Sequence, residues 1–312
     1  MRVPATRVQT TRVFLQMMLP WRRMFGKRTV RRHVQGVELL LPWSHMLPDY
    51  ARTWPAYGQN LVALAAGLSE RADSQPIQVM DIGANVGDSA LQIIARTGAS
   101  VLCVEGDPYW AGYLRRNVGG NPKATIEEVL LTGEAGEWAA ASPVRDHGTT
   151  RFVQDDGIRG ALPAVSAGEL RARHPEFNQL RLIKCDTDGY DPVLVPAAAS
   201  AWRDVGPVVF FEFDPILARA ADQRDPNLIW AVLGELGYTK LAIWDNGGDV
   251  LGQLDIADAA EQAGTLEPRP VQLGYHFWDV AACRDDDEAA RAVFDELMPE
   301  RFSVTGTWRQ AG

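Results

Sequence analysis

Short apolar runs alternate along the chain with segments in which apolar residues recur every three or four positions. The short runs predict buried β-strands, and the periodic segments predict amphipathic helices. The predicted strands cover residues 37–41, 77–81, 101–105, 124–131, 180–186, 208–213, 238–244 and 275–283. The predicted helices cover residues 57–71, 88–96, 108–117, 167–173, 191–202, 226–236 and 286–297. The alternation predicts an α/β fold, with a doubly wound, Rossmann-like, mostly parallel sheet and an antiparallel last strand.

The same pattern divides the chain into an extension and one large domain. Residues 1–36 form a basic N-terminal arm, and residues 37–312 form the α/β domain. Within the domain we expect an N-terminal cap of strand and helix at residues 37–72. Residues 132–163 lack periodicity and are rich in Gly, Asp and Thr, which indicates a functional insertion loop with an edge hairpin around residues 150–154.

Charge separates the two parts. Residues 1–37 hold nine of the 31 Lys and Arg residues, and all 40 Asp and Glu residues lie after them. So acidic a body argues against a nucleic-acid substrate, because phosphates would be repelled. The apolar stretch of the arm is too short to span a bilayer. The arm could lie on an anionic membrane surface, or it could be a basic tail or a strip packed on the domain.

Three cysteines without C-x-x-C spacing indicate core residues in a reducing compartment. We therefore expect a cytoplasmic protein, either free or peripheral at the inner face of the membrane. The pattern sets no oligomeric state.

The segment from Val79 to Asp88 carries the clearest chemical signal. An apolar run ends in an acid, a glycine-spaced turn follows, and a helix begins at Asp88. Glycines allow close approach of a ligand to the backbone, and the helix N-terminus offers unpaired N–H groups. The dinucleotide pattern G-x-G-x-x-G fails, because Asn85 and Asp88 stand where glycines are needed. The flanking acids favour a ligand with a sulfonium and an amino group, S-adenosylmethionine (SAM).

Four acids stand at or just beyond the C-terminal ends of predicted strands: Asp81, Glu105, Asp186 and Glu212. Parallel strands place these ends at one crevice. A carboxylate offers two acceptors to a vicinal diol, so Glu105 is expected to bind the ribose. The alternative, that Glu105 only caps the next helix, is weaker because Asp107 already suits that position. The expected cofactor contacts are Asp81, Gly83, Ala84, Asn85, Gly87, Asp88, Glu105, Gly106, Asp107 and Asp186.

Within this set, Asp81 would bond the amino group of SAM, directly or through water. Gly83, Asn85 and Gly87 would frame the methionine moiety. The alternative for the glycines is an ordinary tight turn between strand and helix.

Transfer of a methyl group to an alcohol needs alignment and a base near the hydroxyl. The candidate catalytic residues are Asp186, Asp188, Glu212 and His45. Asp186 and Asp188 could instead cap the next helix and pair with Lys184. Glu212 could be a buried acid satisfied by backbone N–H groups, and His45 a hydrogen-bonded structural residue. Carboxylates also suit Mg²⁺ or Ca²⁺, but no metal ligands are assigned and a divalent cation is the weaker expectation.

Three blocks in this order resemble the FkbM-type family of SAM-dependent O-methyltransferases. The blocks are Asp81-Ile82-Gly83-Ala84-Asn85-Val86-Gly87-Asp88, Val104-Glu105-Gly106, and Leu182-Ile183-Lys184-Cys185-Asp186-Thr187-Asp188-Gly189-Tyr190-Asp191. The resemblance covers residues 35–215 and implies a class I methyltransferase sheet. It also implies methylation of a hydroxyl on a sugar, a glycan or a natural-product scaffold.

The chain departs from the family pattern at three positions. Aspartate replaces the usual glutamate at Asp188 and Asp191, and Cys185 replaces an aliphatic residue. Aspartate keeps the charge of glutamate but its carboxylate reaches less far from the backbone.

Two other functions remain open. A non-catalytic SAM-binding module in a glycan assembly complex would bind SAM and move no methyl group. A nicotinamide-dependent oxidoreductase is disfavoured by the missing third glycine and the lack of a Tyr-x-x-x-Lys pair.

Overall fold

The computed structural model describes residues 26–73, 76–133, 141–146, 149–154, 163–221, 225–261 and 277–298. Most of the predicted basic arm and much of the 132–163 insertion therefore lie outside the described residues. No helix among the described residues is both long enough and apolar enough to cross a membrane.

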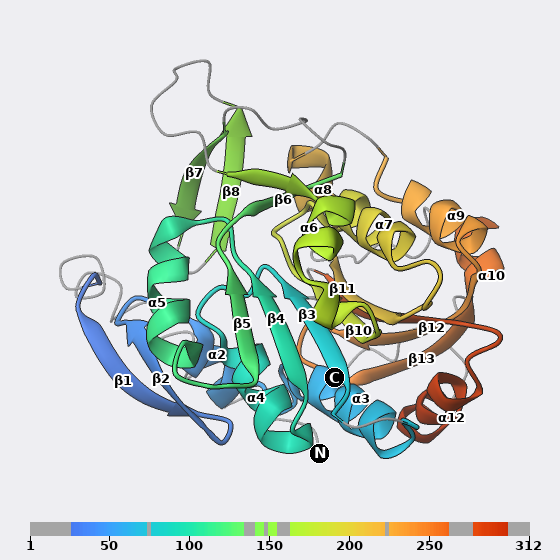
Figure 1. The fold of residues 1–312 in the computed structure, drawn as a ribbon, viewed down its shortest axis with the longest axis horizontal. Coiled ribbons are helices and arrows are strands. Elements are labelled where there is room, and N and C mark those ends of the chain that lie inside the picture. Colours follow the sequence, from blue (N-terminus) through green and yellow to red (C-terminus); the bar gives the residue numbers. More distant parts are fainter. Residues whose placement is uncertain are drawn as a thin grey trace, which may run out of the picture.

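A central sheet of eight strands organises the described chain, in the order β13-β12-β14-β11-β10-β3-β4-β5 (Figure 1). Its strands are β3 (Gln78–Ile82), β4 (Ser100–Val104), β5 (Ala124–Glu127), β10 (Leu180–Cys185), β11 (Val208–Phe213), β12 (Tyr238–Asp245), β13 (Val250–Asp255) and β14 (Trp278–Arg284). The five strands from β11 to β5 run parallel, and β14 runs antiparallel between β11 and β12. The predicted α/β sheet, mostly parallel with an antiparallel last strand, is confirmed.

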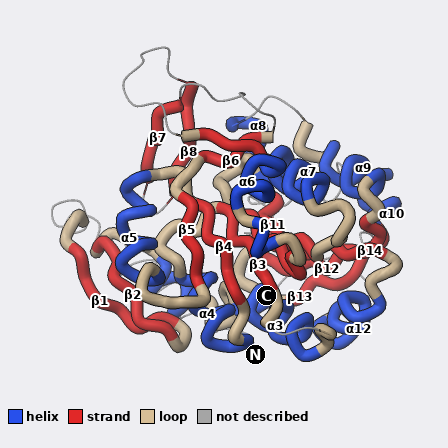
Figure 2. Tube along the Cα trace, in the orientation of Figure 1, coloured by secondary structure: helices blue, strands red, loops and turns tan. Residues whose placement is uncertain are grey.

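Helices cover both faces of this sheet, as the blue tubes around the red strands show (Figure 2). They are α2 (Leu47–Thr53), α3 (Gln59–Glu70), α4 (Asp88–Thr97), α5 (Pro108–Val118), α6 (Ala167–Arg173), α7 (Asp191–Ala201), α8 (Pro215–Ala221), α9 (Leu228–Glu235), α10 (Ile256–Glu261) and α12 (Glu288–Leu297), with a 3₁₀ turn, η1, at Pro175–Phe177. Successive residues of β3 serve opposite faces. Met80 packs with α6, α7 and α9, while Val79 packs with α3, α4 and α12, because side chains alternate along a strand.

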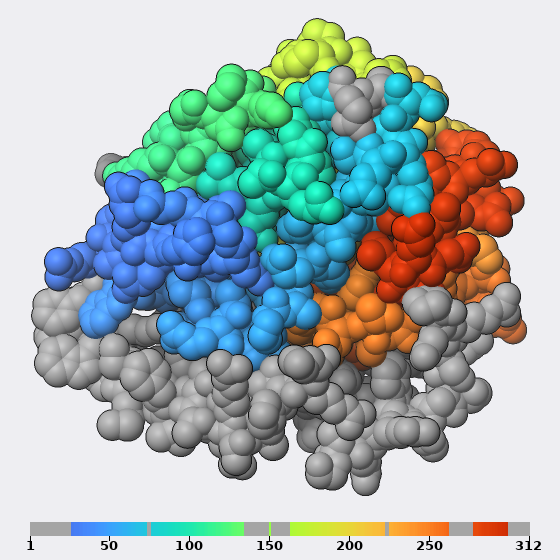
Figure 3. All heavy atoms as spheres, turned by 90° about the horizontal axis from the view of Figure 1, so that it is seen from below, coloured from blue at the N-terminus to red at the C-terminus, as the bar shows by residue number. Residues whose placement is uncertain are grey.

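The elements before β3 make up an N-terminal cap. Strands β1 (Thr29–Val34) and β2 (Val37–Pro42) pair antiparallel, and their apolar side chains pack with Trp110 and Tyr113 of α5. Seen from below, this segment (blue) and the C-terminal elements (orange and red) flank the helices that follow β2 (Figure 3). Strand β1 lies inside the stretch assigned to the basic arm and pairs with β2 of the cap.

Several elements differ from the sequence prediction. The run at 124–131 splits into β5 and β6 (Leu130–Thr132), and β6 pairs with β9 (Ala164–Ser166) outside the main sheet. Strand β13 at the sheet edge and the helices α2, α8 and α10 were not predicted. All are short, and short elements rely on tertiary packing more than on their own periodicity. The hairpin β7 (Ala141–Asp146) with β8 (Thr149–Gln154) forms in the insertion as a separate two-stranded sheet.

Candidate functional site

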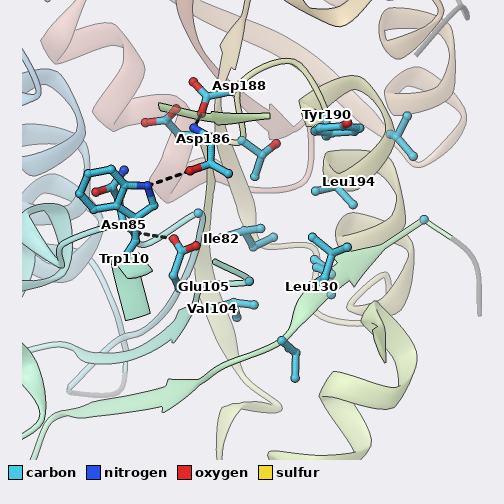
Figure 4. Close-up of a pocket in the computed structure, with 18 residues that line it drawn as sticks. Ile82, Asn85, Val104, Glu105, Trp110, Leu130, Asp186, Asp188, Tyr190 and Leu194 are labelled. Atoms are coloured by element: carbon cyan, nitrogen blue, oxygen red, sulfur yellow. Dashed lines mark hydrogen bonds between the residues drawn. The ribbon is translucent and has the colours of Figure 1, made fainter. Parts of the chain in front are cut away.

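Two cavities meet at the C-terminal edge of the parallel strands. The smaller, of about 80 Å³, lies between the ends of β3, β4 and β10, and the larger, of about 500 Å³, opens beneath the cap. Gly83, Asn85, Asp186 and Asp188 line both. In the smaller cavity, Asn85, Trp110 and Asp188 lie opposite Leu130, Tyr190 and Leu194 (Figure 4). One side is therefore polar and the other largely apolar.

The turn after β3 needs its glycine. Gly83 has a φ of +72°, and a Cβ there would lie 2.0 Å from the carbonyl oxygen of Asp186. Asn85 also has a positive φ of 49°, a conformation that asparagine tolerates better than most residues. The turn thus brings the backbone of β3 directly against the segment that follows β10. Gly87 has a different role, because a Cβ there would meet Leu114 and Val118 of α5.

Glu105 links this turn to the next one. Its Oε2 accepts a hydrogen bond from the Asn85 N–H at 2.8 Å, and its Oε1 accepts one from the Asp107 N–H at 2.7 Å. The residue is 7% exposed, and burial raises the pKa of its carboxyl to about 7 despite these two bonds. A carboxylate has about four lone-pair sites, so Glu105 can still accept from a diol in the smaller cavity.

Thr150 closes this side of the smaller cavity. Its Oγ1 accepts a hydrogen bond from Trp110 Nε1 at 2.7 Å and donates one to Asp107 Oδ2 at 3.0 Å. Its N–H donates to Asp188 Oδ2 at 2.8 Å. Sequence reasoning missed both Thr150 and Trp110. The only signal was the position of Thr150 in a long insertion, and spacing does not reveal which residue of a loop returns to the site.

Asp107 is the N-cap of α5, as predicted, and accepts from the Tyr109 N–H at 2.9 Å. Its other oxygen, Oδ2, accepts from the hydroxyl of Thr150. Asp107 therefore holds Thr150 in place, and it lines neither cavity.

Asp81 lies beneath the turn. Lys184 Nζ is 2.9 Å from Asp81 Oδ1 and 3.6 Å from Asp186 Oδ2, and it donates to the carbonyl oxygen of Gly83 at 3.1 Å. Asp81 is 0% exposed and lines neither cavity. Lys184 stands at this carboxylate, and the expected bond of Asp81 to the amino group of SAM, directly or through water, stays a prediction. Burial alone would lower the pKa of Lys184, but the carboxylates of Asp81 and Asp186 outweigh it and the net pKa is raised.

Of the three carboxylates that follow β10, one is buried in hydrogen bonds within the turn and two line the cavities. Asp191 is wholly buried and accepts from both the N–H and the hydroxyl of Thr187. Asp188, at a positive φ of 52°, faces both cavities, and burial together with the charge of Asp186 raises its pKa to about 7. The side chain of Asp186 is 48% exposed. Asp186 and Asp188 are thus the carboxylates at the junction.

His45 does not fit the base predicted for it. The N–H of Leu47 donates to its Nδ1 at 3.2 Å, and its Nε2 lies 3.4 Å from Asn85 Oδ1. These contacts specify a neutral ring with the proton on Nε2, and burial lowers the pKa of His45 to about 4. The lone pair that a general base would use is already occupied. His45, packed edge-on against Trp110, positions Asn85.

The other predicted residues are divided between the cavities. Gly106 lines the smaller one, and Ala84, Asp88 and Glu212 line the larger one. Gly87 lines neither. The sequence prediction did not include Asp279 of β14, nor Phe210 and Phe277, which also line the larger cavity. Within the described residues, no three His, Cys, Asp or Glu side chains are grouped to hold a metal ion.

Stability of the ligand-free protein should fall as pH rises. Burial raises the pKa values of Glu105, Asp188 and Asp279 to about 7 each. The folded chain therefore holds protons that the unfolded chain loses near pH 4, so the free energy of unfolding decreases from about pH 4 to 7 and then levels off. Calorimetry should give a higher Tm at pH 5.5 than at pH 8, with a smaller difference in Glu105→Gln. A Tm that climbs steadily to pH 8 would contradict this.

Comparison with known proteins gives a likeness of fold. No family model and no curated protein matches the sequence. Among solved structures, the chain is similar to TYW2 of Pyrococcus horikoshii in complex with MeSAdo, with 14% identity, a TM-score of 0.43, and 83% of this chain and 73% of that chain covered. It is also similar to an O-methyltransferase of Bacillus cereus in complex with SAH, with 12% identity, a TM-score of 0.39, and coverage of 73% and 80%. A precorrin-6y C5,15-methyltransferase of Geobacter metallireducens matches with 11% identity, a TM-score of 0.38, and coverage of 72% and 86%. Identities and TM-scores this low indicate a likeness of fold alone.

Proposed function

We propose that this chain is a SAM-dependent methyltransferase that methylates a hydroxyl of a sugar, a glycan or a natural-product scaffold. The observation that carries the proposal is the junction of the two cavities at Gly83, Asn85, Asp186 and Asp188. A cofactor in one cavity and an acceptor in the other would meet there. Methyl transfer needs this arrangement, because the two reacting atoms must approach within about 3–3.5 Å.

The residues that line the smaller cavity offer the polar and apolar groups that the adenosine of SAM would contact. Glu105 would accept the ribose hydroxyls, and Leu130 and Leu194 would pack on the adenine. Gly83 and Gly106 line this cavity, and a Cβ on either would press against backbone atoms of the chain itself. When bound, SAM supplies a methyl group on a sulfonium and leaves as S-adenosylhomocysteine.

The acceptor hydroxyl would be held at the junction. Asp188, with a pKa of about 7, is matched to removing a proton near neutral pH. It would take the hydroxyl proton as the new O–CH₃ bond forms. Asp186 would orient the hydroxyl and offset the positive charge of the cofactor, while Lys184 holds the turn and keeps Asp81 neutralised.

Titration calorimetry with SAM tests the proposal. We expect wild-type protein to bind SAM, and Glu105→Ala to bind it at least tenfold more weakly, a loss of about 1.4 kcal/mol or more. The loss follows from removing the ribose acceptor and from freeing the two backbone N–H groups that Glu105 holds. Glu128→Ala is the matched control, because its ion pair with Arg115 lies on the surface and such pairs contribute little.

Folded protein that does not bind SAM would overturn the proposal and direct attention to nicotinamide cofactors. Binding of SAM without formation of S-adenosylhomocysteine over a broad acceptor screen would instead favour the non-catalytic module.

A further inference from the structure

Two carboxylates face each other on the floor of the larger cavity. Glu212 of β11 and Asp279 of β14 are direct partners in the antiparallel register, so their side chains project from the same face of the sheet. Both line the cavity. Asn60 Nδ2 donates to Asp279 Oδ2 at 2.7 Å, but no Lys or Arg of the described chain forms an ion pair with either carboxylate.

This arrangement is costly without a cation. Burial raises the pKa of Asp279 to about 7 and that of Glu212 well above its ordinary value, and the nearby charge of Asp186 raises both further. Two acids that share a site disfavour each other's ionisation. A positive ligand group would remove this repulsion, because it would bring an opposite charge within a few ångströms of both.

The rest of the larger cavity has the same electrostatic character. The acids that line it are Asp88, Asp186, Asp188, Glu212, Asp214 and Asp279. Lys184 is the only Lys or Arg among the described residues that line it, and it is already paired with Asp81. His45 is neutral at pH 7, since its pKa is about 4. The cavity therefore repels anionic acceptors such as uronic acids and phosphorylated sugars, and attracts cations.

Aromatic side chains complete the wall. Tyr50, Trp54 and Tyr57 come from the cap, with the Tyr50 ring 5.5 Å from Tyr57 and 6.1 Å from Trp54. Phe210 and Phe277 line the cavity as well. Aromatic faces attract cations, and the apolar face of a sugar ring packs on them. A cavity of about 500 Å³ with this lining suits a hydroxylated, positively charged molecule.

Glu212 and Asp279 lie away from the junction at which the methyl group would be transferred. Asp186 and Asp188 line both cavities, whereas Glu212 and Asp279 line only the larger one. We propose that Glu212 and Asp279 bind a protonated amine of the acceptor, so that the enzyme selects amino sugars and related amino alcohols while a hydroxyl faces Asp188. This inference rests on the proposed function, and it changes the role predicted for Glu212 from base to recognition of the acceptor.

Calorimetry on protein saturated with S-adenosylhomocysteine tests it with three probes: D-glucosamine, D-glucose and D-glucuronate. At pH 7, glucosamine should bind at least tenfold more tightly than glucose, and glucuronate more weakly than glucose. Binding of glucosamine should release protons from the pair, because the cation lowers both pKa values. The heat of binding should then depend on the ionisation enthalpy of the buffer.

The variants Glu212→Gln and Asp279→Asn should each reduce the preference for glucosamine over glucose at least fivefold while leaving binding of S-adenosylhomocysteine unchanged. Glu38→Gln, an exposed acid of β2, is the control. The inference is overturned if glucosamine binds no better than glucose, or if neither sugar binds. It is also overturned if the preference for glucosamine survives in the double variant Glu212→Gln/Asp279→Asn. Failure of S-adenosylhomocysteine to bind at all would instead count against the proposed function.

Discussion

Replacing Lys184 with methionine should destabilise the fold by about 3–5 kcal/mol, because it leaves a buried carboxylate without its partner. Lys184 is 5% exposed and Asp81 is 0% exposed, with Nζ and Oδ1 2.9 Å apart. The methionine side chain can fill the space of the lysine stem, so the effect reports the charge rather than a void. Urea unfolding followed by circular dichroism measures it.

Two further variants separate a buried pair from an ordinary one. Lys240→Met removes a pair with Asp255 whose side chains are 32% and 45% exposed, and it should cost less than about 1 kcal/mol. The double variant Lys184→Met/Asp81→Asn should recover much of the lost stability, since it removes the orphaned charge. If Lys184→Met costs no more than Lys240→Met, Asp81 is not a buried charge that depends on Lys184.

Replacing Asp188 with asparagine should lower kcat by about 10²–10⁴-fold, the contribution typical of a positioned general base. The Asn side-chain oxygen can still accept the Thr150 N–H that now bonds Asp188 Oδ2 at 2.8 Å, so the site should keep its shape. Single-turnover assays with the first acceptor found in a screen, together with SAM titration, measure chemistry and binding separately. SAM affinity should change far less than kcat.

The pH profile gives a sharper test of Asp188. Its carboxyl has a pKa of about 7 in the ligand-free protein, so kcat/KM should rise with pH up to about 7 and then level off, because only the ionised form accepts a proton. The cation of SAM should lower this pKa, which places the inflection of kcat at lower pH. Both inflections should vanish in Asp188→Asn. Asp186→Asn is the matched control, and a profile that vanishes there instead would assign the base to Asp186.

Local sequence determined the parts of this protein that depend on neighbours in the chain. The α/β alternation, the glycine turn at Gly83 and the N-cap at Asp107 were all readable from the sequence, and the structure contains each of them. These features follow from periodicity and from backbone conformations available to few residue types. They place Glu105 and Asp186 at one edge of the sheet.

Only the tertiary structure decided what each acid does there. Asp81 and Glu105 look alike in sequence, yet one is covered by Lys184 and the other lines a cavity. Thr150 reaches Asp188 and Asp107 from the hairpin of the insertion, and Asp279 reaches Glu212 through the antiparallel pairing of β14 with β11. Such contacts join residues that are 38 to 103 positions apart. Burial and partners set a carboxyl's pKa and role, and long-range packing, which no local pattern encodes, supplies both.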